Sequence, residues 1–460
     1  MSGELELAAQ VLERVRAADA GAEIQVTVDR NRLALTRFAN SVIHQNVAED
    51  TLGVSITIHR DGRTISASST VADESGFQAL VERTVAAARL APRDPAWPGL
   101  APPDDAATAE PPDPATANAS PEDRAARVKA FVDAASGLET AGYCRTNHWT
   151  GALVNSAGQS VTGESADAGL AGIARRSGND GVARAASGRL ADIDGAVLGA
   201  RAAAKADAAI DPVEIPPARY EVVLEPTAVA DILEAFSMYG FNAKAVAERR
   251  SFVRVGEAQF DATVHLVDDA PATGSSFDAE GTPRRRLVLV DGGTTTALTH
   301  DRRTAAEAGT TSTGHGVGSA SFGAFARHLT LLGRDPAAPG AAEVEGPVVD
   351  DAAAELVAGV ERGVLVTDFW YTRVLDPRSL ALTGLTRNGV WLIERGEVTT
   401  PLRNFRFTQA YAQALMPGAV LAVGRVAPPM PGDTYSASTP RWTAPALHLA
   451  SWNFTGGASG

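Results

Sequence analysis

The spacing of apolar residues changes twice within the first 90 positions. In residues 4–18, ELELAAQVLERVRAA, the period is helical, and one face collects Leu5, Ala8, Leu12 and Val15. From residue 23 the period is two, which predicts strands through Ile24, Val26, Val28, Leu33, Leu35, Leu52, Val54, Ile56 and Ile58. The pair Asp61-Gly62 predicts a two-residue hairpin turn. A second amphipathic helix follows, with a stripe of Phe77, Leu80, Val81, Thr84 and Ala88. The expected order is therefore helix, antiparallel meander, helix.

A stretch rich in Pro, Ala and Asp interrupts this pattern at residues 91–120. It has too little apolar surface to order itself, so we expect an exposed linker or long loop. Ser120-Pro121-Glu122-Asp123 then predicts the start of a helix with a capping box. Short strands with turns at Asn155-Ser156 and Asn179-Asp180-Gly181 lead to an Ala-rich helix at about 190–209. The repeated order suggests a structural duplication within residues 1–210.

Residues 211–219, DPVEIPPAR, predict a second boundary, and strands dominate after it. We expect strands at 220–225, 262–267, 287–290, 364–371, 390–394 and 397–400. Helices are expected at 227–246, 302–308, 350–362 and about 408–415. The sequence therefore predicts an α+β protein with an N-terminal domain at 1–210 and a β-rich C-terminal domain at 216–460.

Composition narrows the class of protein. Of 460 residues, 45% are hydrophobic and 21% charged, which is ordinary for a globular chain. The formal net charge of -14 argues against nucleic acid as a partner. No apolar run reaches the roughly 18 residues of a membrane span, and the acidic start MSGELELAAQ is unlike a signal peptide. The single cysteine, Cys144, excludes an internal disulfide, and we expect a cytoplasmic protein.

The common motifs for nucleotide binding, serine hydrolysis and zinc helices of the HExxH type are absent from the sequence. Among the eight histidines, only His300 and His315 share a neighbourhood with acidic residues, in THDRRTAAEAGTTSTGHG. A metal site needs three or four converging ligands, so we interpret these two as hydrogen-bonded loop histidines. A hydrolytic centre built from them is the alternative.

The stretch SFDAEGTPRRRLVLVDGG, residues 276–293, places Asp278 and Glu280 in a Gly-containing turn before three arginines. One interpretation is a hairpin with solvated, charged flanks. The other is a constellation that orders a cleft or a subunit contact through Arg–carboxylate pairs. Residue types alone leave both open.

Four segments together resemble the TldD/PmbA family, and their order runs over most of the chain. They are RFANSVIHQNVAEDTLGVSITI (37–58), FDAEGTP (277–283), HDRRTAAEAGTTSTG (300–314) and GVWLIERGEVTTPLRNF (389–405). The resemblance implies a cytoplasmic protein of one of two kinds that pair with each other. The TldD kind is a zinc metallopeptidase with an HExxxH helix. The TldE (PmbA) kind lacks that metal site and serves as its partner in trimming or degrading unfolded peptides.

The resemblance puts LEAFSM, residues 233–238, at the HExxxH position. Leu233 and Met238 then stand where the histidines would be, and only Glu234 matches. A catalytic zinc needs three protein ligands, leucine offers none, and a thioether is too soft. A five-residue ligand spacing would also need a widened helical turn. The whole segment 220–255 contains no histidine or cysteine, so we expect no metal on this chain.

We therefore expect a non-catalytic subunit that joins a zinc-bearing TldD-type chain and forms part of a shared cavity for unfolded peptides. By their place in the resembling segments, the candidate cleft or contact residues are Asp278, Glu280, His300, Asp301, Arg302 and Thr304. Two alternatives stay open. One is a stand-alone peptidase or hydrolase that uses His300 and His315, and the other is a self-associating peptide-binding module.

Overall fold

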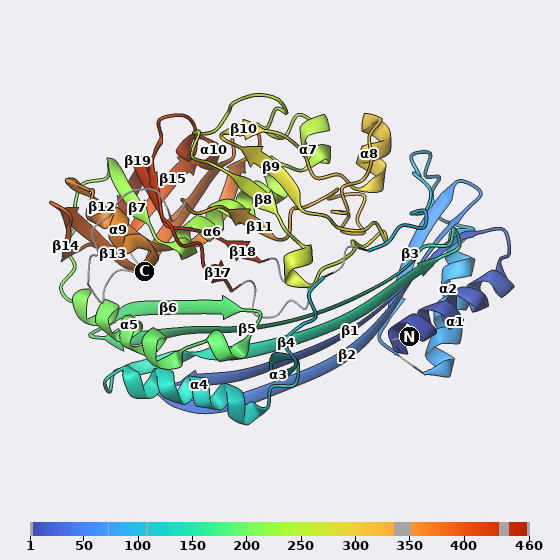
Figure 1. Ribbon diagram of the computed structural model, residues 1–460, viewed down its shortest axis with the longest axis horizontal. Helices are drawn as coiled ribbons and strands as arrows, with labels where there is room; N and C mark the ends of the chain where they lie inside the picture. Colours follow the sequence, from blue (N-terminus) through green and yellow to red (C-terminus); the bar gives the residue numbers. More distant parts are fainter. Residues whose placement is uncertain (1–2, 72, 107–108, 335–350, 432–440, 458–460) are drawn as a thin grey trace.

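A computed structural model describes residues 3–71, 73–106, 109–334, 351–431 and 441–457. The N-terminal half forms one long, curved antiparallel sheet, and the C-terminal half forms two further sheets with short helices (Figure 1). The predicted α+β class is confirmed. In the described chain, no helix has both the length and the apolarity that crossing a bilayer requires.

The predicted order of helix, meander and helix occurs twice in the N-terminal half. The first unit consists of α1 (Gly3–Ala18), β1 (Glu23–Ala39), β2 (Val42–Arg60), β3 (Arg63–Ser69) and α2 (Glu74–Ala88). The second consists of α4 (Pro121–Ala134), β4 (Glu139–Asn155), β5 (Ser160–Arg176), β6 (Asn179–Ser187), a 3-10 turn (Leu190–Asp192) and α5 (Gly195–Ala208). Antiparallel pairing of β1 with β4 joins the two meanders into one sheet of order β3-β2-β1-β4-β5-β6.

Side chains that alternate along the strands show which face of this sheet the helices cover. Ile24, Val26 and Val28 are buried in one cluster with residues of α1 and α2. In the second unit, Phe131 of α4 and Leu198 of α5 pack with β-strand residues in the same way. Since successive side chains point to opposite faces, the odd-numbered residues of β1 between Gln25 and Asn31 face away from the helices. The C-terminal half covers that other face (Figure 1).

One predicted turn is confirmed and another is wrong. Asp61 and Gly62 have φ of 50° and 73°, the left-handed geometry of a two-residue hairpin. The turn expected at Asn179-Asp180-Gly181 lies two residues earlier, at Ser177 and Gly178, with φ of 50° and 83°. Gly181 serves packing instead, because a Cβ there would lie 2.1 Å from the carbonyl oxygen of Ala202 on α5. A turn signal and a packing glycine look alike in the sequence.

The segment expected as an exposed linker is packed onto the C-terminal half. Ala91, Leu100 and Ala101 are buried, and a short helix, α3 (Pro114–Ala117), follows. The Arg302 guanidinium donates to the carbonyl oxygens of Gly99 (3.2 Å), Pro98 (3.4 Å) and Leu100 (2.8 Å). Arg303 makes a bidentate pair with Asp94 at 2.9 and 2.8 Å. The composition of the segment indicates that it cannot fold alone. Side chains some 200 positions away in the sequence hold it in place.

The C-terminal half contains two sheets. One has the order β12-β7-β19-β15-β13-β14, and β12 also pairs with β13, which closes a ring of strands. It consists of β7 (Arg219–Leu224), β12 (Arg362–Asp376), β13 (Ala381–Glu394), β14 (Glu397–Pro401), β15 (Phe405–Ala410) and β19 (Leu447–Gly457), with β16 (Val420–Val423) paired to β19. The other sheet consists of β10 (Thr294–Thr295), β9 (Leu287–Asp291), β8 (Leu266–Asp268), β11 (Leu329–Leu331), β18 (Trp442–Thr443) and β17 (Pro429–Met430).

Most predicted elements of this half are present with changed bounds. The helices are α6 (Pro226–Ala235), a π-helical turn (Phe236–Gly240), α7 (Ala243–Ala247), a 3-10 turn (Pro271–Thr273), α8 (Arg302–Ala308), α9 (Asp351–Val357) and α10 (Tyr411–Ala414). The single helix expected at 227–246 is therefore broken, because Asn242 caps a new helix through the N–H groups of Lys244 and Ala245. The strand expected at 262–267 is mostly a turn, since Asp261 accepts hydrogen bonds from Thr263.

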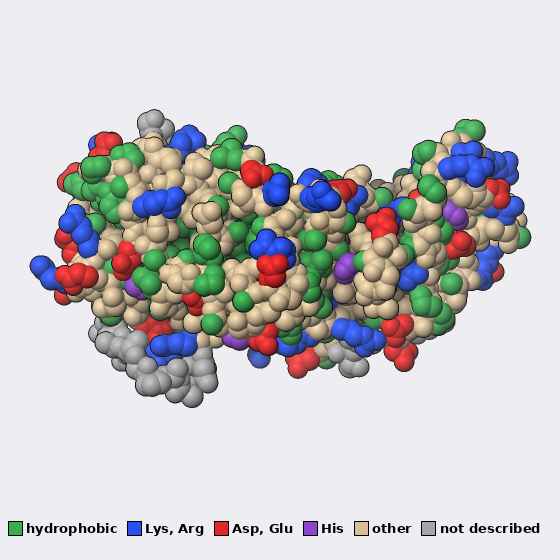
Figure 2. All heavy atoms as spheres, turned by 90° about the horizontal axis from the view of Figure 1, so that it is seen from above, with side chains coloured by type: hydrophobic (Ala, Val, Ile, Leu, Met, Phe, Trp, Pro, Cys, Tyr) green, Lys and Arg blue, Asp and Glu red, His purple; other side chains and the backbone are tan. Residues whose placement is uncertain are grey.

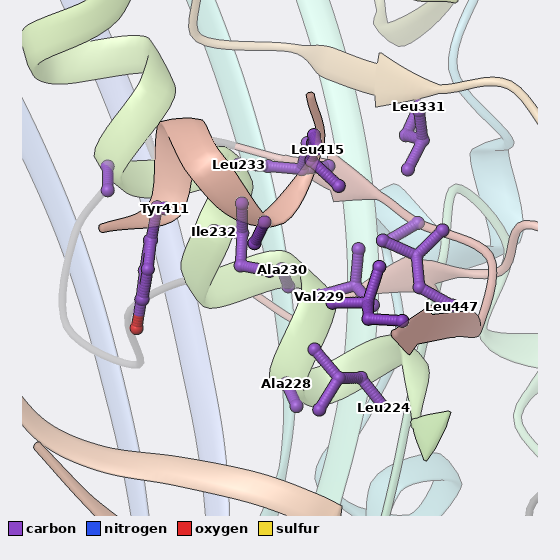
Figure 3. Packing of buried hydrophobic residues seen from close by; sticks show 14 of the residues in the cluster. Leu224, Ala228, Val229, Ala230, Ile232, Leu233, Leu331, Tyr411, Leu415 and Leu447 are labelled. Carbon is purple, nitrogen blue, oxygen red and sulfur yellow. The ribbon is translucent and has the colours of Figure 1, made fainter. Parts of the chain in front are cut away.

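The largest apolar core surrounds α6. Figure 3 shows its residues beside Leu331 of β11, Leu447 of β19 and Tyr411 of α10. Val229, Ile232 and Leu233 are completely buried in this cluster. The helix thus connects both sheets of the C-terminal half, and its apolar face is a packing surface.

Candidate functional site

The two faces of α6 have different surroundings. Pro226 occupies the first turn, where its missing N–H costs nothing, and the helix ends in the π turn. The face opposite the core lines a cavity of about 330 Å³ between the two halves, through Thr227, Ala230, Asp231 and Glu234. Arg184 of β6 and Asp368 of β12 close the cavity. Of the degenerate metal positions Leu233, Glu234 and Met238, only Glu234 lines this cavity among the described residues.

The three positions compared with HExxxH differ in environment. Leu233 is 0% exposed and lies close to Leu415 in the core (Figure 3). Glu234 is exposed and lines the cavity, whereas Met238 is half-buried within the π turn. The widened turn that a five-residue ligand spacing requires is thus present at Phe236–Gly240, with Leu233 and Met238 where ligands would be needed.

The carboxyls around Glu234 are engaged in other contacts. Asp231, which the sequence analysis missed, accepts hydrogen bonds from Tyr411 Oη (2.5 Å) and Thr372 Oγ1 (2.8 Å). Burial raises the pKa of Asp231 to about 6. Asp368 pairs with Arg184 at 2.8 Å. Asp231 lies three residues before Glu234 on an otherwise apolar helix, so the two carboxyls are expected on the same face. This spacing is the signal by which Asp231 could have been found in the sequence.

These residues do not fit a catalytic zinc. Such a site needs converging imidazole, thiolate or free carboxylate donors, and the nearest two carboxyls already bind protein groups. Throughout the described ranges, no cluster of three or more His, Cys, Asp or Glu side chains has the geometry to hold a metal ion.

The predicted cleft residues lie on two adjoining loops. Glu280 Oε2 accepts the backbone N–H of Arg302 at 2.8 Å and so joins the loop at 277–283 to α8. Asp301 is the N-cap of α8, where its Oδ1 accepts the N–H (2.7 Å) and the hydroxyl (2.6 Å) of Thr304. The backbone N–H of His300 donates to Thr313 Oγ1 at 2.8 Å. The structure therefore brings together the residues that the two sequence segments supplied.

Arg302, one of the predicted cleft or contact residues, uses its side chain and its backbone for different contacts. Its side chain binds carbonyl oxygens of residues 98–100, and only its backbone N–H contacts Glu280. The charged side chain orders the crossing segment rather than a carboxylate.

The carboxyls of the buried Asp278 and the half-buried Glu280 act on each other. Asp278 accepts backbone N–H groups from Glu280 (2.9 Å), Thr282 (2.9 Å) and Gly316 (2.8 Å), which fixes the turn. Burial, and then the neighbouring Asp278 carboxyl, raise the pKa of Glu280 to about 8. A Cβ at Gly316 would lie 2.7 Å from Glu280 Oε2, so only glycine allows this approach. The pair can hold a proton at neutral pH.

His300 and His315 do not form the alternative hydrolytic centre. His315 is completely buried, its Nδ1 lies 2.8 Å from the Thr313 carbonyl oxygen, and its Nε2 faces Asp268 Oδ1 at 3.5 Å. His300 is half-buried, and burial lowers its pKa. The buried Asp268 and the half-buried His328 were not singled out from the sequence, because they come from separate strands and loops.

The two loops also hold the halves of the molecule together. Gln25 of β1 donates to the carbonyl oxygen of Ala279 at 3.0 Å, and Gln159 donates to that of Gly281 at 2.8 Å. Beside these contacts, Glu280, Asp301 and Arg302 line a cavity of about 290 Å³. The predicted residues Glu280, Asp301 and Arg302 thus lie at the interface between the N-terminal sheet and the C-terminal half.

Comparisons with known proteins agree with this architecture. The model of the PmbA/TldA metallopeptidase C-terminal domain matches residues 217–451, just over half of the chain, and that of PmbA/TldA metallopeptidase domain 1 matches residues 26–88. No curated protein matches the sequence significantly.

Several solved structures share the fold at low sequence identity. TldE from Thermococcus kodakarensis is 19% identical, with a TM-score of 0.81 over 97% of this chain and 99% of its own. A Thermotoga maritima protein, whose name proposes a modulator of a DNA gyrase, is 18% identical, with a TM-score of 0.79 over 97% and 100% of the two chains. A Bacteroides thetaiotaomicron protein with a similar name is 19% identical, with a TM-score of 0.76 over 98% of each chain.

Proposed function

Because the chain belongs to the PmbA/TldD metallopeptidase family, we propose that it is the non-catalytic, TldE-type subunit of a two-chain zinc protease, whose metal and hydrolysis come from a TldD-type partner. The observation that carries this proposal is the composition of α6 and its surroundings. Residues 220–255 contain no histidine or cysteine, and Leu233 is completely buried in the core.

The chemistry of hydrolysis follows from this composition. Glu234 can accept a proton, but the described residues beside it offer no set of ligands for a metal ion that would lower the pKa of water from about 15.7 toward 7. A carboxylate alone does not generate a competent nucleophile for an amide. The role left to this chain is to bind the partner and to form part of a cavity for unfolded peptides.

An open strand edge supports binding of extended chains. β3 pairs with β2 only from Val54 onward, so residues 42–53 of β2 have a paired neighbour on the β1 side alone within the described chain. Most side chains of this stretch are exposed. Backbone pairing with such an edge holds a peptide without reading its sequence, which suits a protease that trims unfolded peptides.

An exposed aromatic patch on β12 supports a protein partner. Trp370 and Tyr371 are 48% and 61% exposed, and Leu375 is 58% exposed. The guanidinium groups of Arg387 and Arg373 lie 4.1 Å from the ring centroids of Trp370 and Tyr371, respectively. Trp, Tyr and Arg are the residue types that dominate binding energy at protein interfaces.

Co-expression with a TldD-type chain tests the proposal. The two chains should co-purify, and an unfolded peptide should be cleaved by the pair but not by this chain alone. A partner variant whose zinc-ligand histidines are replaced by alanine is the control and should form an inactive complex. Failure of the two chains to associate, with full activity of the partner alone, would contradict the proposal.

A further inference from the structure

A second, larger cavity of about 550 Å³ lies between the sheet and the C-terminal half. Its floor is the face of the sheet opposite the helices, where β1 contributes Thr27, Asp29 and Asn31 at alternating positions. Its roof comes from segments of the C-terminal half at residues 273–284, 317–318, 327–328 and 441. The volume is typical of pockets for small organic molecules, which span roughly 300–1,000 Å³.

The charged side chains around this cavity balance in number but differ in position. The floor contributes Asp29 and Asp167, and the roof contributes Asp278, Arg284, Arg327 and Arg441. Burial lowers the pKa of His328, the remaining titratable group of the lining, so this ring adds no charge. The cavity as a whole therefore has no excess charge, but acidic groups lie on its floor and the basic groups lie on its roof. A ligand that is neutral overall and has a positive and a negative end fits this arrangement.

On the floor, Asp29 is a carboxylate without a cation. Its Oδ1 accepts the Nε1–H of Trp149 at 2.9 Å, and no lysine, arginine or histidine of the described chain pairs with it. Burial raises the pKa of Asp29, because a carboxylate that is removed from water is costly to keep ionised. By contrast, Asp167 already pairs with Arg145 and Arg441. An ammonium group of a ligand would supply a cation for Asp29 and would lie beside the Trp149 ring, which also attracts cations.

On the roof, Arg284 has hydrogen-bond donors without acceptors. It is only 4% exposed, its Nε donates to the Phe277 carbonyl oxygen at 3.1 Å, and its Nη1 has no acceptor among the described residues. The charges of Asp268 and Asp278 act on this guanidinium, so it lacks an acceptor and not negative charge. Buried polar groups nearly always have a hydrogen-bond partner, and the planar guanidinium group matches a carboxylate.

Two aromatic rings lie between these anchors. The ring centroids of Trp149 and Phe277 are 6.0 Å apart, and both residues line the cavity. We propose that this cavity binds a small zwitterion, with its ammonium group against Asp29 and Trp149 and its carboxylate against Arg284. Since the anchors belong to opposite walls, several bonds must separate the two charged ends, as in a dipeptide or an ω-amino acid. The inference goes beyond the proposed protease role, because neither Asp29 nor Arg284 carries that proposal.

The test uses the isolated full chain and three probes of nearly equal length. They are 5-aminopentanoate, pentanoate, which lacks the ammonium group, and pentan-1-amine, which lacks the carboxylate. Ligand-observed NMR titrations should give saturable binding of 5-aminopentanoate and roughly tenfold or weaker affinity for each singly charged probe, since a charged hydrogen bond is lost.

Variants at both anchors separate the two ends of the ligand. Asp29→Asn keeps an acceptor for Trp149 Nε1 and should weaken binding of 5-aminopentanoate roughly tenfold while leaving that of pentanoate unchanged. Arg284→Gln should weaken binding of both probes. Asp50→Asn is the matched control, because Asp50 pairs with Arg30, which follows Asp29 in β1 and so faces the other side of the sheet.

Equal affinity for 5-aminopentanoate and pentanoate, or equal affinity of the parent and Asp29→Asn for 5-aminopentanoate, would overturn the inference. Circular dichroism checks the fold of each variant. If Arg284→Gln is unfolded, the Asp29→Asn variant decides alone, since it should lose affinity for pentan-1-amine and keep that for pentanoate.

Glycylglycine identifies the kind of zwitterion, because the same number of bonds separates its charged ends. Tighter binding of glycylglycine than of 5-aminopentanoate would assign the cavity to dipeptides, and the reverse order would assign it to ω-amino acids. Both orders agree with the inference, whereas absence of saturable binding of both probes would overturn it. The test needs no partner chain, so its outcome is independent of the proposed protease complex.

Discussion

At the scale of single residues, the proposed function rests on side chains that are unsuited to hold zinc. Leu233 and Met238 lie on α6 and its π turn, at the positions that the family resemblance aligns with zinc-ligand histidines. The surrounding structure has adapted, since Leu233 is part of the apolar core and Asp231 binds Tyr411 and Thr372. The helix is therefore a packing element with one polar face.

Replacing Leu233 with histidine tests this role. The variant would leave a cavity and bury an imidazole without partners, so Leu233→His should lower the free energy of unfolding by about 3 kcal/mol or more. Glu234→Gln, at the adjacent exposed position, is the control and should change it by about 0.5 kcal/mol or less. Urea denaturation measures both. A Leu233→His variant as stable as the parent would show that this position is not core.

Glu280 predicts a pH dependence of stability. Burial raises its pKa to about 8 in the folded protein, above the ordinary glutamate pKa of 4.5, so between these values the folded state holds a proton that the unfolded state has released. The free energy of unfolding should therefore fall as pH rises from 4.5 to 8, by at most about 1.4 kcal/mol per pH unit from this group.

Glu280→Gln keeps an acceptor for the Arg302 N–H and removes the titration. Denaturation curves across this pH range should be flatter for the variant than for the parent. Parallel pH profiles of the two proteins would contradict the assignment.

The sequence predicted correctly which side chains of a strand share a face. It predicted less well which distant parts of the chain pack against that face. Alternation places Ile24, Val26 and Val28 on one face of β1, but it does not reveal that Asp29 and Asn31 on the other face meet a second layer. Motif segments identified Asp278 and Glu280, because their spacing is local. The approach of Asp268 to His315 could not be predicted, since distant segments of the chain bring the two side chains together.

At the scale of elements, local signals set starts and turns, and tertiary contacts set lengths. The capping box at Ser120 and Asp123 begins α4 as predicted. By contrast, β13 extends from Ala381, well before the predicted strand at 390, because pairing with β12 and β15 supplies partners for its backbone. The crossing segment near residue 100 is ordered by Arg302 and Arg303 of α8.

Removal of these two side chains should release that segment. In the variant Arg302→Ala/Arg303→Ala, the hydrogen bonds to residues 98–100 and the Asp94 pair are lost, so local opening should become easier. Limited proteolysis should cut the chain between residues 91 and 106 several-fold faster than in the parent. Arg254→Ala/Arg286→Ala is the matched control, because these exposed arginines pair with Glu257 and Asp269, outside that segment. Equal cleavage rates in both variants would contradict this account.

At the scale of the whole molecule, a continuous sheet carries a β-rich body on one face, and helices that include α1, α2, α4 and α5 cover the other (Figure 1). On the face seen in Figure 2, basic and acidic side chains are interspersed, although the formal net charge is -14. Such a mixed surface does not favour a polyanion, and apolar contacts such as Trp370 and Tyr371 are better suited to a protein partner.

The aromatic patch yields a prediction about assembly. Trp370→Ala/Tyr371→Ala should weaken binding to the TldD-type partner roughly tenfold or more, because truncation of exposed aromatic anchors removes a large share of interface energy. Phe322→Ala is the control, since Phe322 is 61% exposed and lies outside the patch. Analytical ultracentrifugation of mixtures gives the dissociation constants. Loss of binding in the Phe322 variant alone would place the interface elsewhere.

The most direct test of the central claim is the zinc content of the isolated chain, measured by mass spectrometry after purification to homogeneity with zinc in the medium. We predict much less than one zinc per chain and no cleavage of an unfolded peptide, with both appearing in the complex with a TldD-type partner. One tightly held zinc per isolated chain, together with peptide cleavage that a chelator abolishes, would contradict the account.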